Sequence, residues 1–233
     1  FDGTVYFIFQ PAEEGGAGAA KMIEEGLFSQ FQMETVWGMH NWPGLPAGEI
    51  AVSDGACMAS ADHFEMTVTG RGGHAAMPHQ AADPVVASAA IVQSLQMLVS
   101  RQTNPVDAAV MSITMIHGGS AFNVIPDEVK LSGTARAFQP ETRARLEQSL
   151  REVSGLTATA HGCSVEIDWR VGYPPTVNHK TEAGRAAEVA RRVVGEGRVH
   201  LNPDPSMGAE DFAFMLEEKP GAYIWLGAGE AQP

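Results

Sequence analysis

The sequence has 233 residues, of which 44% are hydrophobic, so it is long enough for one large domain or two modest ones. A net charge of −13 argues against nucleic acid and an anionic membrane surface as partners, but it does not exclude an anionic small substrate. No apolar run approaches the roughly 20 residues that cross a bilayer, and the first residues lack the pattern of a signal peptide. The two cysteines, Cys57 and Cys163, favour buried thiols in a reducing compartment over a disulfide framework. We therefore expect a cytoplasmic protein.

Two adjacent glutamates, Glu13 and Glu14, follow a run of five apolar residues at positions 5–9. Such a run predicts a strand buried on both faces, as in a parallel sheet. The proline and glycines around the glutamates favour a sharp turn, which places both carboxylates at the carboxyl end of the strand, where open α/β sheets bind ligands. Adjacent residues point in different directions, so one carboxylate can hold a metal while the other faces a bound water. The alternative is a solvated acidic turn.

A second apolar run, at 36–39, is followed by His40 and a Pro-Gly turn. Residues 17–28, which lie between the two runs, have apolar positions near helical spacing. Strand, helix and strand form a βαβ unit, whose crossover places both strand ends at the same edge of the sheet. Glu14 and His40 can therefore converge. The alternative for His40 is a packed or surface histidine.

Five motifs in order resemble the M20 metallopeptidase family, and within it the amidohydrolase branch that includes hippurate hydrolase and the hydrolases of N-acyl amino acids. The motifs are Gln-Pro-Ala-Glu-Glu-Gly-Gly from Gln10, Gly-Met-His-Asn-Trp-Pro from Gly38, Gly-Arg-Gly-Gly-His-Ala-Ala-Met-Pro-His from Gly70, Asn-Val-Ile-Pro from Asn123 and Gly-Ala-Glu-Asp-Phe from Gly208. They span nearly the whole chain, and their order makes the set far more specific than any single motif.

The middle of the chain predicts a β-α-β-β-α-β, ferredoxin-like order. Its expected elements are strands at 62–70, 109–116, 128–138 and 164–171 and helices at 84–98 and 141–160. The family has the same arrangement, as a lid and dimerisation domain inserted into a zinc-peptidase-like α/β catalytic domain. We therefore expect a partial α/β catalytic domain at 1–59 and 176–233 and the lid at 60–175.

The resemblance implies metal-dependent hydrolysis of the amide bond of N-acyl amino acids by two divalent ions. Glu13 would be the general base, and Glu14 and His40 would be metal ligands, a set that suits zinc and also manganese, cobalt or nickel. The family also has a His-x-Asp ligand pair before this region and a ligand histidine after it, which this sequence lacks. The chain alone is therefore expected not to hold both ions.

The resemblance also implies three substrate-binding residues in the lid. The histidine that matches His74 reaches across a dimer into the partner's active site, and the asparagine that matches Asn123 binds substrate. Arg136 suits a free α-carboxylate because a guanidinium donates two parallel hydrogen bonds. The alternatives are a packing histidine and a solvent-facing arginine. Glu210 and Asp211 are expected to cap the helix that follows them, in a loop that the family places beside the active site.

These observations favour an N-acyl-amino-acid amidohydrolase that forms a homodimer through the lid. Two alternatives stay open. The chain could be a fragment that serves only as a dimerisation scaffold, or an M20 peptidase or deacetylase with a different class of substrate.

Overall fold

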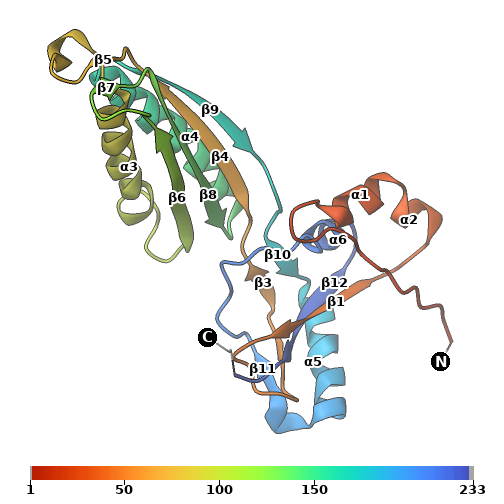
Figure 1. Ribbon diagram of the computed structural model, residues 1–233. Helices are drawn as coiled ribbons and strands as arrows, with labels where there is room; N and C mark the ends of the chain where they lie inside the picture. Colours follow the sequence, from red (N-terminus) through yellow and green to blue (C-terminus); the bar gives the residue numbers. More distant parts are fainter. Residues whose placement is uncertain (1, 231–233) are drawn as a thin grey trace. The chain divides into compact units, whose positions relative to one another are not determined.

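The computed structural model describes residues 2–230, and the chain divides into two compact units (Figure 1). One unit comprises Phe1–Ser60 and Tyr173–Pro233, and the other, which we call the inserted unit, comprises Ala61–Gly172. Within the described part of the chain, no helix combines the length and apolar character needed to cross a membrane.

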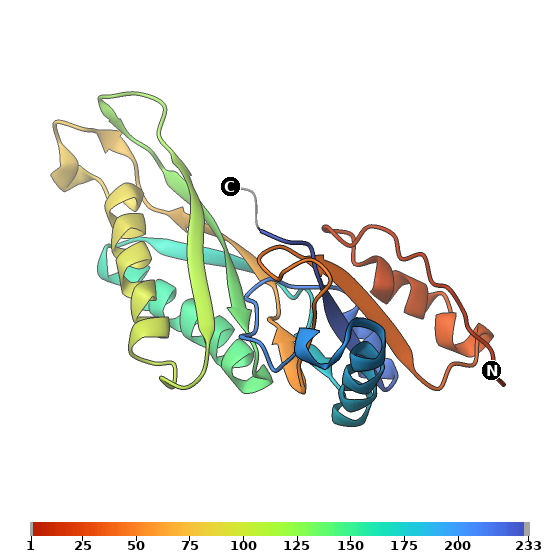
Figure 2. The same cartoon turned by 90° about the horizontal axis from the view of Figure 1, so that it is seen from below.

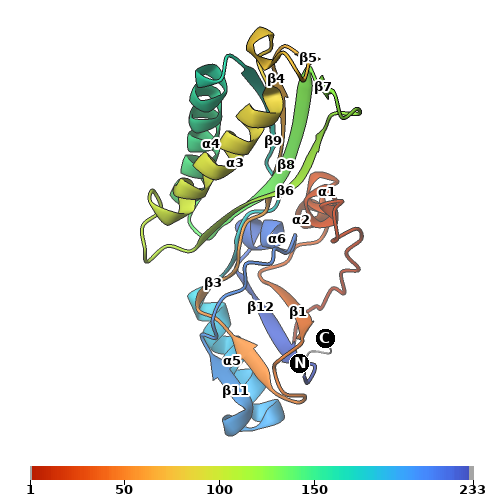
Figure 3. The same ribbon diagram turned by 60° about the vertical axis from the view of Figure 1, so that its left-hand side comes forward.

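The inserted unit has the predicted β-α-β-β-α-β order of main elements. They are β4 (Asp62–Thr69), α3 (Pro84–Ser100), β6 (Ala109–Gly118), β8 (Glu128–Ala137), α4 (Pro140–Ala160) and β9 (Ser164–Arg170). The four strands form an antiparallel sheet in the order β6-β8-β4-β9. Both helices cover the same face of this sheet (Figure 3). A small two-stranded sheet of β5 (Gly73–His74) and β7 (Val124–Ile125), together with the 3₁₀ turn η1 (Pro78–Gln80), completes the unit.

Local sequence explains both the start of α3 and the buried face of β4. The Asp83 side chain accepts hydrogen bonds from the N–H groups of Val85, at 2.8 Å, and Val86, at 3.3 Å, and Pro84 occupies the first helical position. Along β4, alternate side chains are buried from Asp62 onward, and Phe64 and Met66 are the first apolar ones. They pack with the buried apolar face of α3 into one core. The period of two in the strand and the helical period in α3 therefore each place their apolar residues on the side that faces this core.

An ion pair between Asp62 and Arg143 lies where the chain enters and leaves the inserted unit. The Asp62 carboxylate accepts from Nε of Arg143 at 2.8 Å and from its Nη2 at 2.5 Å. The same carboxylate accepts from the N–H of Gly172 at 2.9 Å, and Nη2 donates to the Gly172 carbonyl at 3.1 Å. A Cβ at Gly172 would lie 2.1 Å from the Ala61 carbonyl oxygen, so a side chain there is excluded. This network fastens together the two points where the chain enters and leaves the unit.

We expect Arg143→Met to lower the free energy of unfolding by about 3–5 kcal/mol, because it leaves the Asp62 carboxylate buried without its cation. Asp62 is only 1% exposed, so water cannot replace the lost partner. Urea denaturation measures the change. Arg170→Met is the matched control, since Arg170 forms an exposed pair with Asp168 in the same unit and such pairs contribute little. Equal midpoints for the two variants would contradict the assignment.

The first unit is built on a four-stranded mixed sheet in the order β1-β12-β2-β11. Its strands are β1 (Val36–Trp42), β2 (Ile50–Val52), β11 (Val199–Leu201) and β12 (Gly221–Gly227). β1 and β12 are parallel, as are β11 and β2, whereas β12 and β2 are antiparallel. A separate ribbon pairs β3 (Gly55–Met58) with β10 (Thr176–Asn178).

Helices cover both faces of the first unit's sheet (Figure 2). α5 (Lys180–Val194) packs on one face with Val52 and Ile224. α1 (Gly18–Glu24), α2 (Leu27–Gln30) and α6 (Ala213–Glu218) pack on the other, with Tyr223 and Trp225. Neighbouring side chains along β12 point to opposite faces of the sheet, so this one strand contributes residues to the apolar cores on both faces. A 3₁₀ turn, η2 (Glu196–Arg198), precedes β11. Cys57 and Cys163 are buried free thiols, as predicted, and burial raises the pKa of Cys57 to about 12.

Two expectations for the first 30 residues are corrected. Residues 5–9 do not form a buried strand: no strand is assigned there, and the side chains of Val5, Phe7 and Phe9 are exposed. A strand needs a neighbour to pair with its N–H and C=O groups, and no described strand pairs with this segment. The predicted βαβ unit therefore lacks its first strand. The helix expected over 17–28 is divided into α1 and α2 at Gly26, whose φ of 97° is outside the helical region.

Candidate active site

Glu13 and Glu14 lie in a tight turn between the extended segment and α1. The N–H of Gly15 donates to the Glu13 carbonyl, and the N–H of Gly16 donates to the Ala12 carbonyl, both at 2.8 Å. Glu13 is half-buried, whereas Glu14 is exposed. The two adjacent carboxylates therefore have different surroundings, which is the situation that the sequence predicted for them.

The turn brings Glu13 against a pair of buried carboxylates from the other end of the chain. Carboxylate oxygens of Glu13, Glu210 and Asp211 lie within 4.8 Å of one another. Glu210 accepts hydrogen bonds from the Tyr223 hydroxyl and, at 3.0 Å, from the N–H of Phe212. The contact with Phe212 lies one residue before α6, and α6 receives no hydrogen bond from a capping side chain, so the cap predicted from Glu210 and Asp211 is not formed. The sequence also did not predict that this pair forms one wall of the acidic cluster.

Burial and like charge both act on the pKa of Glu13. Burial contributes most to raising it, followed by the charges of Glu210, Asp211 and Glu14, and the nearby His40 lowers it. The pKa of Asp211 is raised mainly by burial, against the effect of the Ala19 N–H that it accepts. A carboxylate whose pKa moves towards neutrality is a better general base at neutral pH, because proton transfer to it is more favourable.

His40 lies within β1, which continues through Trp42 instead of ending before the histidine. Its ring is exposed, and Nδ1 lies 2.6 Å from the carbonyl oxygen of Asn41. A carbonyl can only accept, so Nδ1 carries the proton and Nε2 keeps its lone pair. This is the tautomer that a metal-ligating histidine adopts when a carbonyl orients its ring. Glu14 and His40 both influence the pKa of Glu13, so the three predicted residues lie near one another even though residues 5–9 form no strand.

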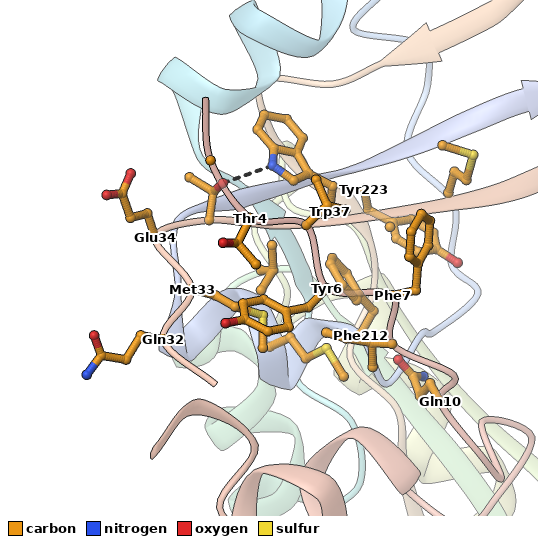
Figure 4. Close-up of a pocket in the computed structure, with 18 of the residues that line it drawn as sticks. Thr4, Tyr6, Phe7, Gln10, Gln32, Met33, Glu34, Trp37, Phe212 and Tyr223 are labelled. Atoms are coloured by element: carbon orange, nitrogen blue, oxygen red, sulfur yellow. Dashed lines mark hydrogen bonds between the residues drawn. The ribbon is translucent and has the colours of Figure 1, made fainter. Parts of the chain in front are cut away.

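A cavity of about 970 Å³ lies beside this cluster (Figure 4). Its lining includes Tyr6 and Phe7 from the extended segment, Trp37 from β1, and Phe212 and Tyr223 near the acidic residues. Glu13 and Glu210 also line it. A cavity that combines aromatic side chains with polar groups and carboxylates is suited to a small-molecule ligand.

The inserted unit brings two of its three predicted site residues together. His74 in β5 pairs with Val124 in β7, and the N–H of Ala75 donates to the Asn123 carbonyl at 3.0 Å. Nδ1 of His74 accepts from the N–H of Ala76 at 3.1 Å, so Nε2 carries the proton of the neutral ring and is free to donate. Both His74 and Asn123 are exposed.

Arg136 is not part of this group. It is half-buried near the carboxyl end of β8, whereas β7 precedes the other end of that strand, and its Nε donates to Oγ1 of Thr134 at 3.2 Å. The structure therefore separates Arg136 from the small sheet that carries His74.

Three further residues that the sequence did not single out contact the glutamate turn or its acidic neighbours: Gln10, Tyr173 and Tyr223. The Tyr173 hydroxyl donates to the Glu13 carbonyl, and the Gln10 side chain donates to Asp211. Tyr173 and Glu13 are 160 positions apart in the chain, and Gln10 and Asp211 are 201 positions apart. No local pattern marks such contacts, although Gln10 begins one of the motifs.

The model of the peptidase family M20/M25/M40 matches residues 1–233. Among curated relatives, an N-acetylcysteine deacetylase of Bacillus subtilis (strain 168) is 42% identical over 225 residues, which are 97% of this chain and 58% of that protein. The hippurate hydrolase of Campylobacter jejuni is 39% identical over 226 residues, covering 97% of this chain and 59% of that one. The crystal structure of a dinuclear metal-binding M20 peptidase from Bacillus subtilis is similar with a TM-score of 0.79 and 35% identity, covering 97% of this chain and 56% of that one.

The chain thus spans a little over half of the length of these relatives. The match of the family model extends over the entire sequence, and the fold agrees with that of a solved member. The chain belongs to the M20/M25/M40 peptidase family.

Proposed function

We propose that the whole protein hydrolyses the amide bond of N-acyl amino acids, hippurate-like substrates among them, with two divalent metal ions. Family membership supports amide hydrolysis, and the names of the two relatives support acylated amino acids as the substrate class. The observation that carries the proposal is the placement of Glu13. Its half-buried carboxylate faces two buried acids and lines a cavity large enough for such a substrate.

The residues present fit part of a metal site. Glu14 is an exposed carboxylate, and His40 has a free Nε2 and an Nδ1 that is already oriented by a carbonyl. An oxygen and an imidazole nitrogen suit zinc, manganese, cobalt or nickel. When bound, the ions would polarise the scissile carbonyl and lower the pKa of a water.

In this proposal Glu13 takes the proton of the attacking water and passes it to the leaving amine. Its raised pKa supports this role, because the carboxylate must first accept a proton and then release it. His74 would donate a hydrogen bond from its Nε2–H group to the developing oxyanion of the substrate, and Asn123 would bind the substrate beside it. Arg136 would bind a substrate carboxylate. This role rests on the chemistry of the guanidinium group alone, since Arg136 lies apart from His74.

The test compares metal content and hydrolysis in two proteins, the 233-residue chain and a form extended to the length of its relatives. Hippurate, N-acetyl amino acids and simple dipeptides serve as the substrate panel. The proposal predicts that the extended form binds two ions per chain and hydrolyses the N-acylated substrates. Cleavage of dipeptides alone would favour a peptidase, and metal-free, inactive protein of both lengths would favour the scaffold.

The cytoplasm is the compartment we propose, because both thiols are free and buried.

We further propose that the protein is a homodimer formed through the inserted unit. Among the described strands, only β8 pairs with β6, so the other edge of β6 has no strand beside it in this part of the chain. Met115 and Ile116 near its carboxyl end are 50% and 58% exposed. A free edge with apolar side chains is suited to pairing with a second copy about a two-fold axis.

Sedimentation velocity over a range of concentrations is expected to show a dimer, and Ile116→Lys to weaken it at least tenfold, because the new charge would be buried in the interface. Leu156→Lys on α4 is the matched control, since Leu156 is also exposed but lies away from the β6 edge. A monomer at all concentrations, or equal weakening by both variants, would rule out this interface.

A further inference from the structure

One buried carboxylate holds both ends of the loop that carries Glu13 and Glu14. Asp211 is fully buried, and each of its two oxygens has a partner. Oδ1 accepts from the side-chain amide of Gln10, just before the loop, and Oδ2 accepts at 2.9 Å from the N–H of Ala19, just after it. Hydrogen bonds to an ionised acceptor are about twice as strong as neutral ones. Asp211 therefore forms a bridge between the start and the end of this loop.

The loop itself is closed and strained. A Cβ at Gly18 would lie 1.7 Å from the carbonyl oxygen of Pro11, so the backbone at the loop's end touches the backbone at its start. Ala12 and Ala17, which flank the glutamate turn, have φ of 54° and 48°. This left-handed conformation is unfavourable for a residue with a side chain and persists only where the surroundings enforce it. Two such residues in one loop require contacts that hold them.

A second contact holds the middle of the loop. The Tyr173 hydroxyl donates to the Glu13 carbonyl and accepts, at 3.4 Å, from the N–H of Ala17. This contact links the turn to the residue where the chain re-enters the first unit. Tyr173 fixes the turn from one side, while Asp211 fixes its two ends.

We propose that Asp211 is a positioning residue that holds the Glu13–Glu14 loop in the conformation used for hydrolysis. The expected effect on turnover rests on the proposed function, whereas the expected effect on the conformation of the loop does not. In this proposal Asp211 acts through the loop, since each of its oxygens accepts a hydrogen bond from one end of it, from Gln10 and from Ala19. A shift of about 1 Å in Glu13 would be enough to lower turnover by roughly a hundredfold.

The substitution at Asp211 decides how much of the bridge remains. Asp211→Ala removes both acceptors and leaves the Ala19 N–H without its partner. Asp211→Asn keeps one oxygen for Ala19, and the Gln10 amide can turn over so that its own oxygen accepts from the new amide group. Gln10→Met, which has a similar size, removes only the contact at the start of the loop. The expected order of effect is therefore Asp211→Ala, then Gln10→Met, then Asp211→Asn.

Hydrogen exchange of the 233-residue chain, followed by mass spectrometry, measures how well the amides of the loop are protected and needs neither metal nor activity. We expect Asp211→Ala to speed exchange of the amides at 12–19 by about 10- to 100-fold, the range for losing hydrogen bonds to a charged group. Met215→Ala is the control for a purely structural effect, since Met215 is 1% exposed in the same core but does not hold the loop. It should speed exchange throughout the first unit, including β1 and β12.

In the extended, metal-loaded protein, we expect Asp211→Ala to lower kcat while KM changes little, and Asp211→Asn to retain most of the turnover. If Asp211→Ala does not fold, Gln10→Met provides the same loop-confined exchange readout. Exchange that rises equally across the unit in Asp211→Ala and Met215→Ala would overturn the positioning role, as would unchanged exchange at 12–19. An inactive wild-type protein with loop-confined exchange in the variants would instead count against the proposed function alone.

Discussion

Glu13→Gln is expected to lower kcat by about 10²- to 10⁴-fold in the extended, metal-loaded protein while leaving its metal content unchanged. Glutamine fills the same space beside Glu210 and Asp211 but cannot accept the proton of water. Glu14→Gln should instead lower the affinity for metal, and turnover should fall because metal is lost. Metal analysis after dialysis, combined with turnover of hippurate at saturating metal, measures both quantities.

The reason for the difference is the contrast between the two side chains. Glu13 is half-buried with a raised pKa, which suits a group that gains and loses a proton, and Glu14 is exposed, which leaves its oxygens open to an ion. Glu25→Gln is a matched control, because it removes the same charge at the exposed carboxyl end of α1. Equal loss of metal from Glu13→Gln and Glu14→Gln would show that the two residues share one role.

His74→Ala should lower turnover by about 10²- to 10³-fold without changing metal content, the effect expected for one hydrogen-bond donor to an oxyanion. The neutral tautomer with a proton on Nε2, set by the Ala76 N–H at Nδ1, is the form that can donate. His79→Ala is the matched control, since His79 is exposed in the nearby 3₁₀ turn η1 and is expected to have no catalytic role. Steady-state kinetics of the two variants test the assignment.

Subunit mixing then tests whether His74 acts on the partner's site. His74→Ala and Glu13→Gln proteins are each nearly inactive in this prediction. A mixed dimer contains one site in which an intact Glu13 meets an intact His74 from the other chain, so each mixed dimer should reach about half of the activity of a wild-type dimer. If subunits exchange and no activity returns, His74 serves its own chain or has only a structural role.

The inserted unit shows how far the sequence alone can determine a fold. Its six main elements were predicted to within one or two residues, from the Asp83-Pro84 start of α3 to the alternation of β4, whereas the short β5, η1 and β7 were not. Each of these signals is local: a cap, a helical period or a strand period acts within a few residues of itself. The sequence of its four strands and two helices then leaves few ways to form a sheet with both helices on one face.

The first unit shows where local signals fail. Residues 5–9 have the composition of a buried strand, but a strand exists only when another strand pairs with it, and no described strand does so. The short strands β2, β3, β10 and β11 had no predicted counterpart. Each has only three or four residues and is fixed by its neighbours in the sheet, not by its own period.

The site divides in the same way. The sequence by itself determined the candidate residues Glu13, Glu14, His40 and His74, because a motif carries its chemistry in adjacent residues. Only the tertiary structure decided that Asp211 accepts hydrogen bonds from both ends of the Glu13–Glu14 loop and that Tyr173 donates one to its middle. These contacts join residues more than 150 positions apart. Such contacts depend on how sheets and helices pack, which a local pattern does not encode. The candidate site residues are thus readable in the sequence, while the residues that hold them in place become visible only in the folded chain.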